Sequence, residues 1–201
     1  VEVGEIGKKD PSTGEQALTT VVEAITFIKA LQKKEVYPDM LAIHNGTAHG
    51  NAFDPEGNPI PQLGIDLQRT REIAEAIAPL GVVITQHGTT GTSMENLNLF
   101  GRSGIFKANV ATNWQNIMWE HLPREMQQKI IDWQWENLGN MRGKYSSDAE
   151  FLDKTRKYAN KFILREYFGE IPLASLQAIF DEAYQSAVEY FRAFNALNLL
   201  P

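Results

Sequence analysis

The sequence predicts an α/β fold with parallel strands, followed by a region that is helical throughout. Three observations lead to this prediction. In the first 111 residues, short apolar runs rich in β-branched residues alternate with segments that carry apolar residues at helical spacing, which is typical of parallel strands joined by crossover helices. The apolar runs lack polar alternation, as expected of strands buried on both faces. After Trp114, only helical patterns remain.

The elements follow from the start of the chain. Residues 1–7, VEVGEIG, are strand-like, and the capping-box pattern from Ser12 to Glu15 precedes a helix predicted over residues 18–34. Because a complete protein rarely begins in mid-strand, we expect an upstream part that was cleaved off or lies on another chain. The later elements are strand 40–46, loop 51–64, helix 65–80, strand 81–86, a short helix capped by the Thr92 to Glu95 pattern, strand 105–111, and helical stretches 123–137, 148–168 and 172–198.

Composition restricts the class of protein. The chain has 201 residues and a net charge of −6, with no cluster of Lys or Arg, so we expect neither a nucleic-acid partner nor an anionic membrane surface. There is no cysteine, which excludes disulfides and thiolate zinc sites and fits a reducing compartment. No apolar run approaches the ~20 residues that span a bilayer. These features predict a cytoplasmic protein.

Two histidines suggest a metal site. His49 and His87 each follow a predicted buried strand, and each is followed by glycine. Imidazole is a common ligand of zinc and other divalent ions, and a catalytic site needs about three protein ligands. The alternative is a hydrogen-bonded loop histidine at each position. The other two histidines are expected to be structural: His44 packs at a strand end, and His121 precedes Pro123 at a helix entrance.

Glycine and threonine after the strands suggest an anion site beside the metal site. The segments 87–91, HGTTG, and 109–112, NVAT, place glycines and hydroxyls at strand ends. Backbone N–H groups at such positions bind phosphate. Each segment alone is more often an ordinary turn. No Walker-type or Ser/His/Asp pattern competes with this interpretation.

The combination of motifs resembles a known family. GTAHG at 46–50, QHGTTG at 86–91 and KANVATNWQ at 107–115 resemble the motifs that end barrel strands six, seven and eight of the zinc-dependent class II fructose-bisphosphate aldolases. The opening segment looks like strand five of that family, and the closing FRAFNALNLL looks like its C-terminal helix. The resemblance implies the C-terminal half of a TIM (β/α)8 barrel in residues 1–122. Residues 123–201 would be a helical extension that packs on the barrel or on a partner subunit.

The resemblance also implies roles for individual residues. His49 and His87 would be two of three ligands of zinc or another divalent metal, while Gly50 and Gly88 would lie beside the substrate phosphate and a monovalent cation. The implied substrate contacts are phosphate for Thr90 and Thr112, the reacting ketose for Asn109, and the second phosphate of a neighbouring subunit's site for Arg156. A solvent-exposed helix arginine is the alternative for Arg156.

The chain departs from the family pattern in three respects. The family's third zinc histidine and catalytic aspartate come from earlier strands that this chain does not contain. Glu5 matches a glutamate near the metal, and Glu15 is a weak candidate for proton transfer whose alternative role is that of a capping-box partner. Ala111 stands where fructose-specific members tend to carry Asp and tagatose-type members tend to carry Ala.

The expected function is therefore metal-dependent cleavage of a ketose 1,6-bisphosphate, with fructose 1,6-bisphosphate as the first candidate, to dihydroxyacetone phosphate and glyceraldehyde 3-phosphate. Two alternatives stay open, a tagatose-bisphosphate aldolase and a non-catalytic half-barrel or partner subunit. Apolar positions on the last helix, including Phe180, Tyr184 and Phe191, suit the core or a subunit interface and lead us to expect a homodimer or larger assembly. The N-terminal half of the barrel is missing from this chain.

Overall fold

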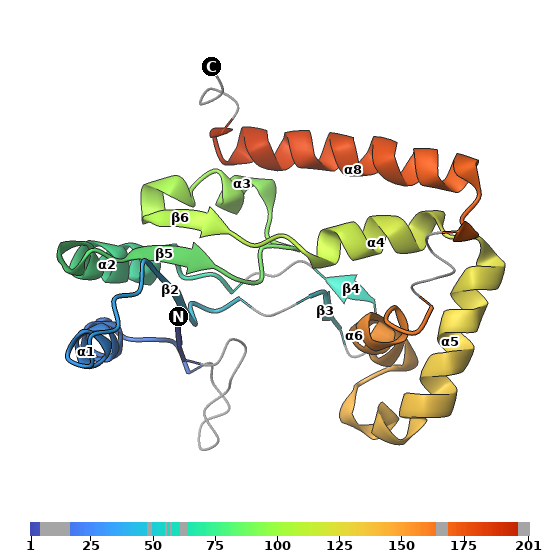
Figure 1. Ribbon diagram of the computed structural model, residues 1–201, viewed down its shortest axis with the longest axis horizontal. Helices are drawn as coiled ribbons and strands as arrows, with labels where there is room; N and C mark the ends of the chain where they lie inside the picture. The colour runs from blue at the N-terminus through green and yellow to red at the C-terminus, as the bar shows by residue number, and fades with distance from the viewer. Residues whose placement is uncertain are drawn as a thin grey trace. The chain divides into compact units, whose positions relative to one another are not determined.

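The computed structural model describes residues 1–4, 17–47, 50–54, 56, 58–60, 64–163 and 169–196. The chain divides into two compact units, each built from separate stretches of sequence (Figure 1). The first unit comprises Val1–His49, Pro61–Val110 and Tyr190–Pro201, and the second comprises Gly50–Ile60 and Ala111–Glu189. The division at residue 122 expected from the sequence stays a prediction.

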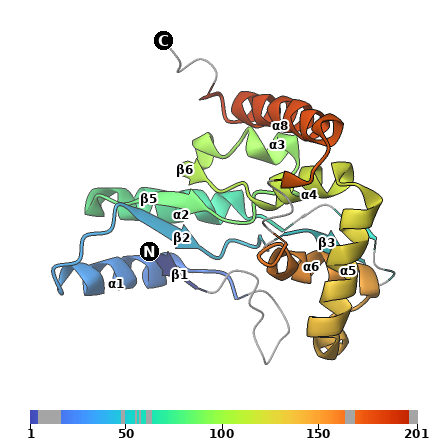
Figure 2. The same cartoon turned by 45° about the vertical axis from the view of Figure 1, so that its right-hand side comes forward.

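A four-stranded parallel sheet forms the centre of the first unit. Its strands β1 (Glu2–Val3), β2 (Met40–Ile43), β5 (Val83–Gln86) and β6 (Ile105–Ala108) lie in the order β1-β2-β5-β6 (Figure 2). Ala42 of β2 pairs with Glu2 on one side and with Thr85 on the other. The predicted α/β fold with a parallel sheet is thereby confirmed. Since all four strands are parallel, their carboxyl ends meet at one edge of the sheet, where ligand sites of such folds lie.

Two helices pack against this sheet and against each other, α1 (Val21–Gln32) and α2 (Leu67–Ile77). Thr20 begins α1 with a reciprocal capping box, because its hydroxyl accepts from the Glu23 N–H and the Glu23 carboxylate accepts from the Thr20 N–H. The short elements η1 (Ala78–Leu80), α3 (Met94–Leu97) and η2 (Gly101–Ser103) complete the unit. Its fully buried apolar side chains include Ala24, Ile28, Leu41, Ile73, Ile77, Ile84 and Leu97.

Several local features differ from the sequence expectation. The segment expected to be a plain loop contains an antiparallel hairpin of β3 (Ala52–Phe53) and β4 (Pro59–Ile60), whose two-residue strands are too short to give a periodic signal. The cap of α3 is Ser93, whose hydroxyl accepts from the Asn96 N–H at 3.3 Å, one residue beyond the expected Thr92. His44 is fully buried, which confirms that it packs at the end of β2.

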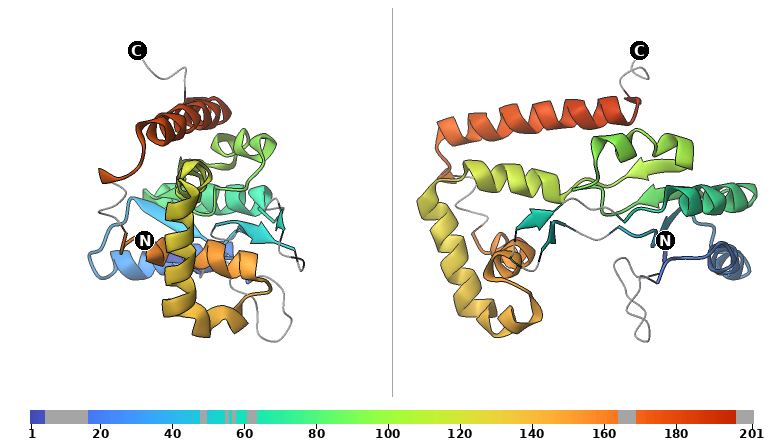
Figure 3. Two further views of the ribbon diagram at one scale, coloured as in Figure 1. Left: turned by 90° about the vertical axis from the view of Figure 1, so that its right-hand side faces the viewer. Right: turned by 180° about the vertical axis from the view of Figure 1, so that it is seen from behind.

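The second unit contains the helices α4 (Thr112–His121), α5 (Arg124–Leu138), η3 (Gly139–Lys144) and α6 (Asp148–Ala159) together with the β3–β4 hairpin (Figure 3). Helices α5 and α6 pack on each other. The helix expected over residues 148–168 ends at Ala159, and residues 164–168 lie outside the described residues. The apolar core of this unit consists of Leu122, Met126, Ile130, Ala159 and Ile163.

Helix α8 (Leu173–Ala193) is the last and longest helix. In the second unit, Asn113 donates to the Ser186 hydroxyl at 2.8 Å, and His121 at the end of α4 lies 2.5 Å from the Glu182 carboxylate. Phe180 and Tyr184, which the sequence assigned to the core or an interface, are 65% and 66% exposed in the single chain. Within the described part of the chain, no helix is long and apolar enough to cross a bilayer.

Candidate functional site

A buried network of amides and hydroxyls joins the carboxyl ends of β2 and β5. The Gln86 amide accepts from Asn45 Nδ2 at 2.7 Å and donates to Asn45 Oδ1 and Thr47 Oγ1, both at 3.1 Å, and to the His87 carbonyl at 2.7 Å. Asn45 also donates to Thr70 of α2 at 2.9 Å. Asn45, Thr47, Thr70 and Gln86 are at most 1% exposed. Because these buried groups are mutually satisfied, the network fixes the two loops that leave β2 and β5.

His87 is held at this edge by its neighbours in sequence and in space. Its carbonyl accepts from Gln86 and from the Thr47 hydroxyl at 3.0 Å, and its Nδ1 lies 3.4 Å from Nδ2 of Asn109. Asn109 is placed there because its N–H donates to the Gln86 carbonyl and continues the β5–β6 ladder. In the tautomer with the proton on Nδ1, the Nε2 lone pair is the one that a metal ion would use.

The loop after His87 is tight and largely buried. Gly88 has φ of +67°, Thr89 and Thr90 are 0% and 7% exposed, and the Thr92 hydroxyl donates to the Gly88 carbonyl at 3.4 Å. The Thr89 hydroxyl is buried and has no hydrogen-bond partner among the described residues. The loop therefore brings Gly88 and Thr90 next to His87, as the sequence predicts for a site at a strand end.

The second unit brings together two other predicted residues, Gly50 and Thr112. Thr112 is the first residue of α4. Gly50 has φ of +75°, and a Cβ at this position would lie 3.8 Å from the Thr112 hydroxyl and 3.3 Å from Nζ of Lys154. Glycine is needed here because the positive φ and the close approach both exclude an ordinary side chain.

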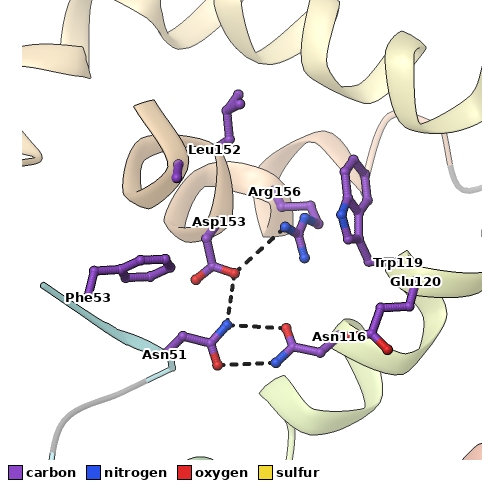
Figure 4. Close-up of a pocket in the computed structure, with 9 residues that line it drawn as sticks. Asn51, Phe53, Asn116, Trp119, Glu120, Leu152, Asp153 and Arg156 are labelled. Carbon is purple, nitrogen blue, oxygen red and sulfur yellow. Dashed lines mark hydrogen bonds and ion pairs between the residues drawn. The ribbon is translucent and has the colours of Figure 1, made fainter. Parts of the chain in front are cut away.

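Arg156 lines a cavity of about 350 Å³ in the second unit (Figure 4). Its guanidinium lies 4.1 Å from the centre of the Trp119 ring and 3.7 Å from the Asp153 carboxylate, and its side chain is 13% exposed. Asn51 donates to Asp153 at 2.9 Å and pairs with Asn116 across the same cavity. Arg156 is thus not the solvent-exposed helix arginine considered as its alternative, because Trp119 and Asp153 hold it.

The structure brings the predicted residues together in two sets. His87, Gly88, Thr90 and Asn109 meet in the first unit, and Gly50 and Thr112 meet in the second. His49, Glu5 and Glu15 lie outside the described residues. Within the ranges described, no three side chains of His, Asp or Glu are arranged to hold a metal ion. His87 fits one position of an imidazole site, and the rest of a ligand set must come from elsewhere.

Sequence reasoning missed four residues that shape these sets, namely Asn45, Gln86, Asn51 and Lys154. Gln86 was noted as the end of an apolar strand, and a buried amide at that place was the available signal. Asn51 and Lys154 carried no signal, because their contact joins positions 103 residues apart.

Comparison with known proteins gives a family and a fold. The sequence model of the family described as "Fructose-bisphosphate aldolase class-II" matches residues 1–193. Among curated proteins, no sequence matches the chain.

Solved structures resemble the chain at low sequence identity. A probable tagatose 6 phosphate kinase from Sinorhizobium meliloti 1021 is 15% identical, with 92% of this chain and 59% of that chain covered and a TM-score of 0.52. The fructose-bisphosphate aldolase from Campylobacter jejuni is 14% identical, with 97% and 51% covered and a TM-score of 0.49. The YdjI aldolase from Escherichia coli K12 is 16% identical, with 74% and 44% covered and a TM-score of 0.38. The chain thus spans about half the length of these proteins, and the likeness to the first of them is one of fold.

Proposed function

Because this chain belongs to the class II fructose-bisphosphate aldolase family, we propose that it is part of a metal-dependent aldolase that cleaves a ketose 1,6-bisphosphate. Fructose 1,6-bisphosphate is the first substrate to test, with dihydroxyacetone phosphate and glyceraldehyde 3-phosphate as products. The observation that carries the proposal is the family match over residues 1–193, which includes all three strand-end motifs. The grouping of His87, Gly88, Thr90 and Asn109 at one sheet edge supports it.

We also propose that the chain supplies the C-terminal four strands of a TIM barrel. The strands β1, β2, β5 and β6 are parallel and follow one another in the sheet in chain order, as successive strands of such a barrel do. A closed barrel has eight strands and about 250 residues, so the other strands would come from the missing N-terminal half. The helical region would then contact the barrel or a second copy in a homodimer or larger assembly.

The metal would be held by His87, by His49, and by a third ligand outside this chain. A divalent ion held by imidazoles supplies Lewis-acid chemistry: it polarises the ketose carbonyl and stabilises the negative charge that develops as the carbon–carbon bond breaks. Asn109 supports the role of His87, because its side-chain amide sits against Nδ1 and can fix the ring orientation.

The remaining residues would position the substrate. Gly88, Thr90, Gly50 and Thr112 would bind one phosphate through backbone N–H groups and hydroxyls, with a monovalent cation beside them, and this anchoring converts binding into orientation of the reacting carbons. Asn109 would also contact the ketose. Glu15 remains a candidate for proton transfer, and Arg156 remains a candidate for the second phosphate.

The test is aldol cleavage of fructose 1,6-bisphosphate by the purified protein, measured with and without a chelator and after readdition of Zn²⁺. We expect chelator-sensitive cleavage, and we expect His87→Ala to lower both the bound metal per chain and the rate. His44→Ala serves as the matched control, because His44 ends the neighbouring strand but is not assigned to the metal. Wild-type metal content in His87→Ala would show that the metal assignment is wrong.

Two observations favour related alternatives. Ala111 favours a tagatose-type substrate by the resemblance, so both ketose bisphosphates should be assayed and Ala111→Asp should shift the preference toward fructose. The coverage of about half of the related structures favours a subunit that acts with a second chain. The mass of the native assembly, measured with the components identified, separates that case from a homo-oligomer.

A further inference from the structure

Three segments of the second unit converge on Gly50: the loop before β3, the first residue of α4 and the middle of α6. Lys154 of α6 donates from Nζ to the backbone carbonyl of Asn51, next to Gly50. The space where a Gly50 side chain would begin is 3.3 Å from that Nζ and 3.8 Å from the Thr112 hydroxyl. An ammonium, a hydroxyl and the backbone of a glycine with positive φ therefore surround one small space.

The ammonium of Lys154 is half-buried and pre-positioned. Its stem lies beside the Phe53 ring, whose centre is 5.9 Å from Nζ. Burial lowers the pKa of Lys154, and the Asp153 and Glu150 carboxylates oppose this shift. Asp153 is itself engaged by Asn51 and Arg156, so its charge is shared among three neighbours. A partly desolvated cation held in this way interacts more strongly with an anion than a solvent-exposed lysine does.

We infer that Lys154 is a phosphate-binding residue, whose ammonium contacts a substrate phosphate placed between the Thr112 hydroxyl and the backbone of Gly50. This inference rests on the proposed function, which brings a phosphate to Gly50 and Thr112, and it adds a side chain to which neither the sequence motifs nor the resemblance gave a role. An ammonium carries three N–H donors, so it can hold the Asn51 carbonyl and a phosphate oxygen together. The hydrogen bond to Asn51 fixes the ammonium before the ligand arrives.

The absence of a side chain at position 50 fits this assignment. A methyl group there would lie closer to Nζ than carbon atoms ordinarily approach, and the backbone would be strained by the positive φ. Glycine therefore keeps open the space between the ammonium and the hydroxyl.

The experiment compares Lys154→Met, which removes the charge and keeps an apolar stem, with Lys154→Arg, which keeps a cation. Lys157→Met is the matched control, because Lys157 lies one turn further along α6 and is exposed. Inorganic phosphate is titrated into each full-length protein by calorimetry, and KM and kcat are measured with fructose 1,6-bisphosphate. We expect Lys154→Met to weaken phosphate binding about tenfold and to raise KM more than it lowers kcat. Lys154→Arg should stay within about threefold of the wild type, and Lys157→Met should be unchanged.

A second measurement needs no folded variant. In the wild type, inorganic phosphate should slow the reductive methylation of Lys154, followed residue by residue by mass spectrometry, and should leave Lys157 unaffected. Unaltered phosphate affinity in a folded Lys154→Met protein, no protection of Lys154, or no phosphate binding by the wild type would each overturn the inference. If phosphate binding depends on Lys154 but neither ketose bisphosphate is cleaved, the inference holds and the proposed reaction is wrong. If cleavage occurs but phosphate binding ignores Lys154, the reverse is true.

Discussion

Replacing Gln86 with Met should destabilise the first unit markedly, because the change keeps the size of the side chain and removes its amide. Gln86 lies at the end of β5, is 1% exposed, and bonds to Asn45, Thr47 and the His87 carbonyl. Its NH2 group has two hydrogens and its oxygen accepts one hydrogen bond from Asn45, so about three bonds are lost. At about 1 kcal/mol net for each bond, the expected loss is about 3 kcal/mol.

The assay is thermal unfolding followed by circular dichroism. For a chain of this size, about 1 kcal/mol corresponds to about 2–4 °C, so Gln86→Met should melt about 6–12 °C below the wild type. Gln68→Met is the matched control, since Gln68 is exposed on α2 and has one hydrogen bond to Glu72 within that helix. We expect the control to melt within about 2 °C of the wild type. A similarly small shift for Gln86→Met would refute the claim that the network holds the two loops.

Two further predictions concern the first unit. Gly104→Ala should destabilise more than Gly81→Ala in urea titrations: both residues have φ near +78°, but the new methyl at 104 would lie 2.4 Å from Cβ of Ala74, whereas nothing lies within 4 Å at 81. Backbone strain gives about 1–2 kcal/mol at both sites, the clash adds about 1–3 kcal/mol at 104, and equal losses would contradict the packing. Thr20→Ala should cost about 1 kcal/mol at neutral pH. Hydrogen bonds from Thr20 lower the pKa of Glu23 below its ordinary 4.5, so this contribution is present above that pH and is lost as the pH falls through the lowered pKa. The difference between variant and wild type should narrow in acid, and a constant difference from pH 7 to pH 3 would show that Glu23 takes no part.

The sheet was predictable because each of its strands carries its own signal. The apolar runs that contain Leu41, Ile84 and Ile105 can be read without knowing their neighbours, and the polar residues that follow them mark the ligand edge. The start of α1 was available in the same way, since Thr20 and Glu23 have the spacing of a capping box next to an apolar helix face.

The pairing of polar side chains was not predictable, because no local pattern encodes it. Asn45 and Gln86 are 41 residues apart and meet only because β2 and β5 are neighbours in the sheet. Lys154 looks like any lysine of an amphipathic helix, and its burial depends on where α6 packs. Arg156 illustrates the same limit: its contact with Trp119 joins two helices whose packing is absent from the sequence pattern.

The division of the chain has a consequence for how the protein folds and how it can be cut. The backbone passes from one unit to the other after residues 49, 60, 110 and 189. The polar cluster of the second unit requires Asn51 to meet Asp153, 102 residues later, and Tyr190, which is buried with the first unit, comes later still. Contacts of such large sequence separation form slowly, because a long loop must close before any gain in energy. During synthesis, both units stay incomplete until almost the whole chain has emerged, and no single cleavage site would yield either one intact.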